Sequence, residues 1–424
     1  MTVVTDDRCG KSSRDPLNIC LLTYRGNPAS GGQGVYVKYL SKALRELGHR
    51  VDVLSGPPYP LLDQGIRLHK LPSLDLYNPD HLFKPKERRS LLSPINAFEF
   101  LSMCLGGFPE PLTFGLRAYR HFRRRRPCYD IVHDNQCLSY GLWGLKKMGF
   151  PVVATVHHPI TVDRATELAA ADTWKKRLKV LRWYSFIGMQ RRVIRRLSHL
   201  ITVSEASRRD ISREFNLPIR RFRVVPNGIN TEFFYPLPDI PRHPHRLLAT
   251  NSADIPLKGL AYLLEAVAAV RRTRRVELVV IGRPKKNGEV EKKIRELGIG
   301  DIVSFKGRIP YEAFAEEYAR ATVAVIPSLY EGFGMPAGEA MACGVPVIST
   351  KGGALPEVVG DAGILVPPAD ARALAEAILK LLGSSEERER LGKAGRERVG
   401  RSMTWRHAAE KTVETYREAI HAHH

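Results

Sequence analysis

Short apolar runs that suit buried strands alternate with amphipathic stretches that suit helices along the whole 424-residue chain. The run from Leu17 to Thr23 is followed by a helix-like stretch from Val35 to Leu47, and then by a second apolar run from Val51 to Leu54. Parallel strands need a crossover segment between them, so this alternation predicts an α/β fold with parallel sheets. The remaining strands are predicted at 131–133, 152–156, 200–203, 222–225, 247–250, 276–281, 302–305, 323–326, 345–348 and 364–366.

The length of the chain predicts two domains, because 424 residues exceed what one ordinary core accommodates. A cluster of prolines marks the linker between them, at Pro226, Pro236, Pro238, Pro241 and Pro244. We therefore expect domains at 16–235 and 236–402, followed by a final helix at 405–422. Residues 56–111 are rich in proline and are predicted to be an irregular insertion that shapes an acceptor site.

The net charge of +22 attracts anions of any kind and does not identify a partner. The charge is concentrated in the first half, in the stretches 123–126 and 175–196. Apolar residues recur at helical spacing within the second stretch, at Trp174, Leu178, Leu181, Val193, Ile194 and Leu197. Such a helix either lies on a membrane surface or packs its apolar stripe on its own sheet, and we favour packing. Nucleic acid is not expected as a partner, because no binding motif accompanies the charge.

The six cysteines show no CxxC pairing, and several fall in apolar segments. We expect reduced, buried thiols and no metal site. The first ten residues lack the pattern of a signal peptide, and no run of about 20 apolar residues is present that could span a bilayer. These features predict a cytoplasmic protein; peripheral attachment to the inner face of the membrane stays open because of the basic charge.

The stretch 328–349 carries the strongest indication of a site. It follows the predicted strand at 323–326, and ligands of open α/β sheets bind at the carboxyl ends of strands. Gly332 and Gly334 let a ligand approach the backbone, and Pro336 is predicted to be the first residue of a helix whose free N–H groups suit a diphosphate. The carboxylates of Glu331 and Glu339 can accept hydrogen bonds from sugar or ribose hydroxyls. The alternative is that Glu339 only complements the helix dipole and that Glu331 is solvated.

Two further segments suit phosphate. The glycine run from Gly31 to Gly34 lies between the first predicted strand and helix, where a phosphate-cradling turn belongs, although glycines also make plain turns. Lys258 precedes the first predicted helix of the second domain, where a lysine can neutralise a leaving diphosphate. The alternative for this lysine is a solvated side chain.

The spacing of Glu331 and Glu339, with the sequel 340–360, resembles the Glu-x7-Glu signature of the retaining glycosyltransferases of family 4. The resemblance extends from about Leu17 to Tyr416 and is strongest in the C-terminal half. It implies the GT-B architecture, with two Rossmann-like domains whose parallel sheets face each other across a cleft and a C-terminal helix that returns to the first domain. It also implies a nucleotide diphosphate sugar as donor, a hydroxyl acceptor on a lipid or glycan of the cell envelope, no cofactor and no metal.

The resemblance also assigns roles to residues. The catalytic residues that it implies are His157, Lys258 and Glu331. The residues expected to bind the donor are Gly32, Gly34, Arg283, Arg308, Phe333, Gly334, Met335 and Glu339. The polar groups at the end of the predicted strand 131–133 face the same crevice, so we place His133 and Asn135 on the acceptor side, together with His158. Ser204, Asn227 and Gly228 match family positions too, but a helix cap and a turn explain them as well.

The chain departs from the family pattern at Ala253, where an arginine is commoner, and Arg283 is the candidate to replace that cation. The expected chemistry is front-face transfer, in which the departing diphosphate is stabilised by Lys258 and helix N–H groups. Two alternatives stay open. One is another enzyme with this domain plan, such as an epimerase, and the other is a non-catalytic basic scaffold with a degenerate sugar site.

Overall fold

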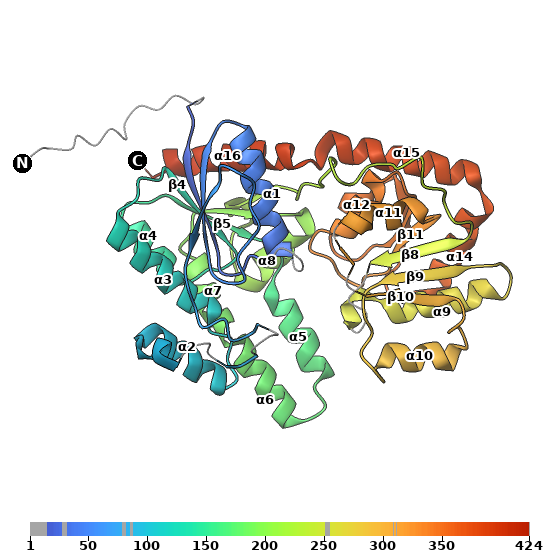
Figure 1. Ribbon diagram of the computed structural model, residues 1–424, viewed down its shortest axis with the longest axis horizontal. Coiled ribbons are helices and arrows are strands. Elements are labelled where there is room, and N and C mark those ends of the chain that lie inside the picture. The colour runs from blue at the N-terminus through green and yellow to red at the C-terminus, as the bar shows by residue number, and fades with distance from the viewer. Residues whose placement is uncertain are drawn as a thin grey trace, which may run out of the picture. The chain divides into compact units, whose positions relative to one another are not determined.

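The chain folds into two compact units, which are described separately (Figure 1). The structure is a computed structural model that describes residues 15–27, 32–78, 82–84, 88–250, 255–307, 309–310 and 312–423. The first unit comprises Met1–Thr202, Arg209–Val225 and Ala409–His424, and the second comprises Val203–Arg208 and Pro226–Ala408. Residues 226–235, which the sequence assigned to the first domain, thus cluster with the second unit.

The first unit contains a parallel sheet of seven strands in the order β3-β2-β1-β4-β5-β6-β7. Its strands are β1 (Asn18–Thr23), β2 (Arg50–Ser55), β3 (Arg67–Lys70), β4 (Ile131–Asn135), β5 (Val152–Val156), β6 (His199–Thr202) and β7 (Phe222–Val224). The chain builds outward from β1 to β3 on one side and from β4 to β7 on the other. The order therefore reverses between β1 and β4, and the carboxyl ends of these two strands form the switch point of the sheet.

The helices of the first unit are α1 (Gly32–Glu46), α2 (Pro94–Cys104), α3 (Glu110–Arg125), α4 (Gly141–Lys147), α5 (Ile160–Ala170), α6 (Trp174–Trp183) and α7 (Ile187–Ile194). Two further helices, α8 (Glu205–Phe215) and α16 (Trp405–His421), begin in residues of the second unit and end in the first. Tyr416 on α16 is fully buried, and its hydroxyl group contacts His133 on β4. The last helix is thus fastened to the sheet of the first unit.

The second unit contains a parallel sheet of six strands in the order β10-β9-β8-β11-β12-β13. Its strands are β8 (Arg246–Thr250), β9 (Glu277–Ile281), β10 (Val303–Lys306), β11 (Val323–Ile326), β12 (Val347–Thr350) and β13 (Gly363–Val366). Its helices are α9 (Leu260–Arg271), α10 (Glu289–Leu297), α11 (Glu312–Arg320), α12 (Met335–Ala342), α13 (Leu355–Val359), α14 (Ala371–Gly383) and α15 (Ser385–Ser402). Here the switch point lies between β8 and β11.

Helices cover both faces of the second sheet, and the strand sequences explain why. Leu248 and Val279 point into one apolar core with α12 and α15, while their neighbours Leu247 and Leu278 point into another core with α9 and α14. Successive side chains of a strand face opposite sides, so a strand covered on both faces must be apolar at every position. The prediction of an α/β fold with two parallel sheets is confirmed.

The structure corrects the prediction for residues 56–111. This stretch is not irregular throughout, because it contains strand β3 at the edge of the sheet, a 3-10 helix (Arg88–Leu92) and helix α2. β3 has the polar sequence Arg67 to Lys70, and α2 has a charged residue, Glu99, on its buried side. Neither pattern has the apolar periodicity by which elements are recognised.

The amphipathic stretch 174–197 is also not one helix. It divides into α6, none of whose residues is buried, and α7, whose Val193 and Ile194 are fully buried. The prediction that this stretch packs on its own sheet was thus correct for α7 and wrong for α6. The prediction that the cysteines are buried was also wrong for two of them, because Cys104 and Cys128 are exposed. No helix in the described part of the chain is long and apolar enough to cross a membrane.

Candidate active site

In the second unit, Lys258 and Glu331 form an ion pair at the switch point of the sheet. Lys258 follows β8 and Glu331 follows β11, and the Lys258 Nζ lies 2.7 Å from Glu331 Oε1. The same carboxylate oxygen accepts a hydrogen bond of 2.8 Å from the Ser328 hydroxyl. Glu331 Oε2 has no hydrogen-bond partner among the residues that the structure describes. One carboxylate oxygen thus holds both the lysine and the serine hydroxyl.

Gly259 makes this pairing possible. It caps α9 with φ of +66°, and a Cβ atom there would lie 2.0 Å from the carbonyl oxygen of Pro327. Only glycine tolerates both the left-handed conformation and such a close approach. The backbone N–H of Leu329 also donates to the Leu257 carbonyl, at 2.8 Å. The loops after β8 and β11 are therefore joined directly beneath the ion pair.

The loop that carries Glu331 leads into α12. Gly334 caps this helix with φ of +101°, and Pro336 is its second residue rather than its first. The Phe333 side chain is buried in the core, so a ligand can meet this segment only through its backbone, and Met335 is partly buried. The free N–H groups of the first turn remain suited to an anion.

Glu339 lies in this helix and is partly exposed. Burial of its carboxyl group raises its pKa to about 7, while a hydrogen bond with the Tyr318 hydroxyl, at 3.3 Å, acts in the opposite direction. The group therefore changes its charge near neutral pH. Nothing places it in contact with Glu331, so the two glutamates have separate environments.

Arg283 is the other expected cation that the structure describes. Arg283 follows β9 and is exposed, and its guanidinium group lies over Gly307, where an added Cβ would come within 2.5 Å of its Nε. It makes no described contact with Lys258 or Glu331. Arg308 and Ala253 lie outside the described residues. Replacement of the missing arginine by Arg283 thus stays a prediction.

Sequence reasoning missed how the loop after β11 is held. The hydroxyl groups of Ser204 and Ser207 both donate to the carbonyl of Gly332, at 2.8 and 3.1 Å. Ser204 also caps α8 by accepting the Ser207 N–H, and Glu357 accepts two further N–H groups at that helix end. Ser204 thus acts as the expected cap and fixes the glycine loop as well. Gly228 is explained by packing, because a Cβ atom there would lie 2.4 Å from Trp405.

In the first unit, His157 and Asn135 meet at the carboxyl ends of β5 and β4, beside the switch point. The His157 Nε2 lies 2.7 Å from Asn135 Oδ1, and the His157 ring contacts Tyr36 edge to face at 4.7 Å. Asn135 Nδ2 donates to the Gln33 carbonyl at 3.2 Å, so its oxygen must face the histidine. The His157 Nε2 therefore carries the proton. Burial lowers the pKa of His157 to about 3, which keeps the ring neutral at physiological pH.

The remaining residues predicted for the first unit have different surroundings. Gly32 begins α1, and Gly34 lies against the backbone of Asn27, where a Cβ atom would come within 2.1 Å of its carbonyl oxygen. Gly31 lies outside the described residues. His158 pairs with Asp163 at 2.9 Å.

His133 does not face an acceptor. It is 1% exposed, and its two ring nitrogens contact the hydroxyl groups of Tyr416, at 2.5 Å, and Thr155, at 2.7 Å. Burial lowers its pKa to about 3, and the nearby His157 adds to this effect. We therefore regard His133 as a structural residue that fastens α16 to the sheet.

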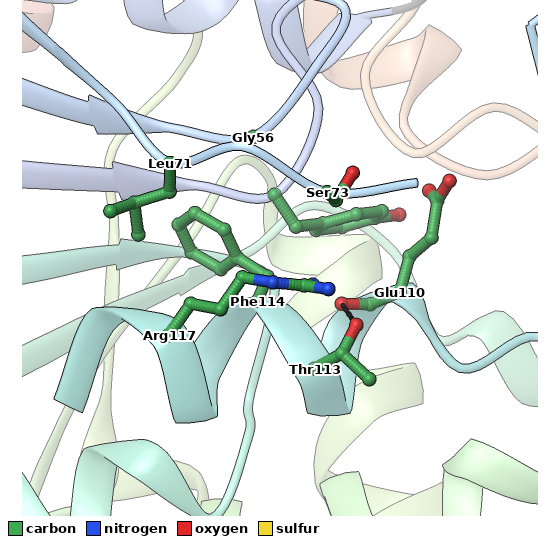
Figure 2. Close-up of a pocket in the computed structure, with 8 residues that line it drawn as sticks. Gly56, Leu71, Ser73, Glu110, Thr113, Phe114 and Arg117 are labelled. Carbon is green, nitrogen blue, oxygen red and sulfur yellow. Dashed lines mark hydrogen bonds between the residues drawn. The ribbon is translucent and has the colours of Figure 1, made fainter. Parts of the chain in front are cut away.

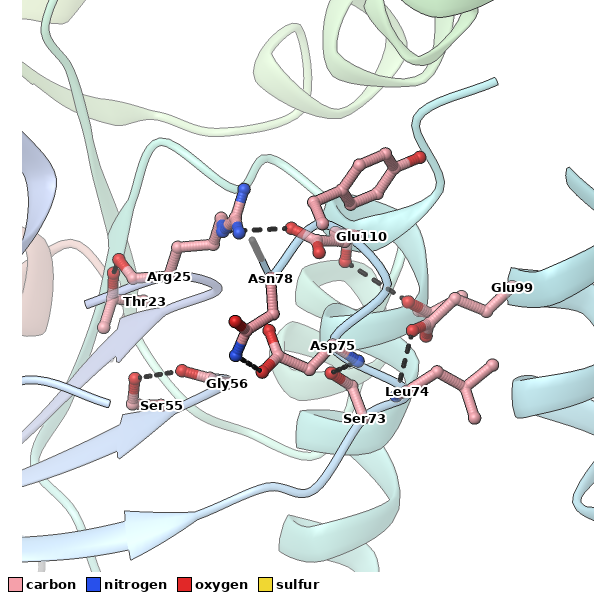
Figure 3. Close-up of polar contacts among 12 residues, drawn as sticks. Thr23, Arg25, Ser55, Gly56, Ser73, Leu74, Asp75, Asn78, Glu99 and Glu110 are labelled. Carbon is pink, nitrogen blue, oxygen red and sulfur yellow. Dashed lines mark hydrogen bonds and ion pairs between the residues drawn. The ribbon is translucent and has the colours of Figure 1, made fainter. Parts of the chain in front are cut away.

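A second polar cluster of the first unit surrounds a small cavity (Figure 2). The volume of the cavity is about 10 Å³, so it accommodates about one water molecule and no sugar. Glu110 lines it, and burial raises the pKa of this carboxyl group to about 8 although Arg25 lies 3.4 Å away. Figure 3 shows this ion pair and the neighbouring bond from the Leu74 N–H to Glu99. These contacts fasten α2 and α3, and we assign them a structural role.

Comparison with known proteins identifies the class to which these features belong. The family model "Glycosyltransferase Family 4" matches residues 30–233, and "Glycosyl transferases group 1" matches residues 245–398. The chain is 49% identical over 408 residues to an MMP alpha-(1->4)-mannosyltransferase of Mycolicibacterium hassiacum, covering 95% of this chain and 98% of that protein.

Solved structures agree in fold. Sucrose-phosphate synthase from Thermosynechococcus elongatus is 27% identical, with a TM-score of 0.73 over 96% of this chain and 100% of that one. Anabaena HepE, solved in complex with UDP and glucose, is 17% identical, with a TM-score of 0.67 over 94% of this chain and 99% of that one. The second comparison supports the fold alone.

Proposed function

Because the chain belongs to glycosyltransferase family 4 and is a hexosyl-transferring enzyme of the GT-B fold, we propose that it is an α-(1→4)-mannosyltransferase. The observation that carries this proposal is the 49% identity to the Mycolicibacterium enzyme, which extends over nearly the full length of both chains. The donor is then a nucleotide diphosphate mannose, and the acceptor is a sugar with a free hydroxyl at position 4.

We assign the leaving diphosphate to the second unit. Lys258 supplies the positive charge, and the free N–H groups at the start of α12 supply further donors. Glu331 holds Lys258 through Oε1 and accepts a hydroxyl of the transferred sugar through Oε2. Glu339 accepts hydrogen bonds from the ribose. The ion pair of Lys258 with Glu331 and the family resemblance support these roles.

We assign contacts with uncharged sugar hydroxyls to His157 in the first unit. Its ring is neutral, and the hydrogen bond from its Nε2–H to Asn135 Oδ1 fixes both the tautomer and the orientation of the ring. Transfer needs no covalent intermediate on the protein in this scheme. If the donor is α-linked, an α-linked product means that configuration is retained. A lipid-linked or cell-envelope acceptor stays a prediction from the sequence.

The test is a transfer assay in which GDP-mannose, UDP-glucose and ADP-glucose are offered separately with an α-mannoside acceptor. We expect transfer from the mannose donor only and a product whose new linkage is α-(1→4) by NMR. Transfer of glucose alone would overturn the choice of sugar. Donor turnover that does not depend on the acceptor would favour an epimerase or hydrolase instead.

A further inference from the structure

Helix α2 is anchored through a charged residue and presents its apolar residues to solvent. Its only buried residue in the described structure is Glu99, which accepts the Leu74 N–H (Figure 3). Glu99 also pairs with Arg117 at 2.6 Å. Leu101 and Leu105, by contrast, are 60% and 62% exposed. A stabilised helix with an apolar outer stripe is unusual in a protein surrounded by water alone. The stripe consists of Pro94, Ala97, Phe98, Leu101, Cys104 and Leu105.

Helix α6 has the same exposure and carries the charge. None of its residues is buried, and Trp174, Leu178 and Leu181 recur along one side of it. Trp174 is 69% exposed. The helix contains no acidic residue, while its cations are Lys175, Lys176, Arg177, Lys179 and Arg182. Lysine and arginine around a Trp and Leu stripe are typical of helices that lie at a membrane interface.

The turn that follows α2 packs against the end of α6. Phe108, just beyond α2, stacks on Trp183 of α6 with ring centroids 5.0 Å apart, and Gly106 approaches Arg182 closely. Both helices lie at the same end of the first unit (Figure 1). We call the exposed residues of the two helices, taken together, the α2–α6 surface.

We propose that the α2–α6 surface docks on an anionic lipid bilayer. The charge selects this occupant, because the cations of α6 attract anionic headgroups while the apolar stripes enter the boundary of the acyl chains. A second copy of the chain is disfavoured as occupant, since it would bring two cationic helices together. The inference concerns residues outside the candidate active site and does not depend on the proposed transfer reaction.

Sedimentation with vesicles tests the proposal. The full chain should bind vesicles of phosphatidylcholine that contain phosphatidylglycerol and should bind pure phosphatidylcholine vesicles far more weakly. Added salt should weaken the binding, because the attraction is screened. Tryptophan emission should shift to shorter wavelength as Trp174 leaves water, and Trp174→Phe should remove most of this shift. Equal binding to both kinds of vesicle, or to neither, would overturn the proposal.

Two variants locate the binding. Lys175→Gln combined with Lys179→Gln should weaken vesicle binding about 25-fold, at about fivefold for each cation. Leu101→Ser combined with Leu178→Ser should weaken it at least about tenfold. Both variants should retain transfer to a soluble acceptor, which shows that they fold.

Matched controls come from the second unit. Tyr235 is 46% exposed, and the Arg372 side chain is 90% exposed, so Tyr235→Ser and Arg372→Gln change an apolar group and a charge elsewhere. Vesicle binding should be unchanged in both. If a control variant lost vesicle binding to the same extent as the α2–α6 variants, this result would contradict the proposal. Light scattering provides a second check. If the wild-type chain formed a dimer that the α2–α6 variants dissociate, the surface would be an interface between two copies of the chain, and the proposal would be contradicted.

Discussion

The two units differ in the charge of the side chains at and beside their switch points. In the second unit, a lysine and a glutamate form an ion pair after β8 and β11, and the lysine side chain is 32% exposed. In the first unit, the carboxyl ends of β4 and β5, beside the switch point, hold Asn135 and His157, which are uncharged and joined by a hydrogen bond. Charge thus collects where we propose that a diphosphate binds, while the other site holds uncharged polar groups, to which we assign sugar hydroxyls. Substitutions in each unit can test whether charge is divided in this way.

The largest effect should come from Lys258→Ala. Loss of the cation that stabilises a leaving diphosphate should lower kcat/KM by about 10² to 10³. Steady-state transfer measurements provide the check, with Lys292→Ala as the control because this lysine pairs with Glu289 on α10, away from the site. A decrease of less than threefold would contradict the ionic role of the second unit.

Glu331→Gln should separate kcat from donor affinity. The amide cannot hold Lys258 as an ion, so kcat should fall by about 10 to 100, as expected for a lost hydrogen bond to a charged group. Binding of free nucleoside diphosphate should tighten, because a negative charge beside Lys258 has been removed. Weaker nucleoside diphosphate binding would show that Glu331 has a different role.

Asn135→Ala should lower kcat/KM by about tenfold, because the His157 ring loses the acceptor that fixes its orientation. Asn135→Asp provides a sharper test. It keeps an acceptor, but its negative charge should raise the pKa of His157 toward the usual range, so that activity becomes dependent on pH below about 6. Unchanged pH profiles in the Asp variant would argue against contact between these groups in solution.

The smallest effect should be the pH dependence of the wild-type enzyme. The pKa of Glu339 is raised to about 7 by burial, so its carboxylate is present above that pH and is lost as the pH falls. We expect kcat/KM for the donor to fall about threefold from pH 8 to pH 6, since a protonated carboxyl group is a weaker acceptor. Glu339→Gln should remove this dependence. His157 should not contribute, because its pKa is already far below this range.

The sequence was sufficient to predict the buried strands of both sheets. Runs such as 152–156 and 323–326 are mostly apolar and mostly β-branched, and both strands occur at these residues. The sequence was insufficient to predict α2. Hydrophobic periodicity identifies a helix only when its apolar residues face inward, and α2 is held by the buried Glu99 instead. The edge strand β3 was missed for a related reason, since its four residues are partly exposed or exposed.

For the site, the sequence identified residues but not their partners. Lys258 and Glu331 were both recognised by resemblance, yet their ion pair depends on the contact of Gly259 with Pro327, which no local pattern encodes. His133 was assigned to the acceptor side because it follows an apolar run. Its true partner, Tyr416, lies 283 residues further along the chain and cannot be inferred from local sequence.

The division of charge between the two units is tested most directly by calorimetric titration with GDP and UDP. Wild type, Lys258→Ala and His157→Ala should be compared with whichever nucleotide binds the wild-type chain. We predict that Lys258→Ala weakens binding at least about tenfold, as expected for a lost charge-assisted hydrogen bond, and that His157→Ala changes it less than about twofold. Equal weakening by both variants, or weakening by His157→Ala alone, would contradict the assignment of the diphosphate to the second unit.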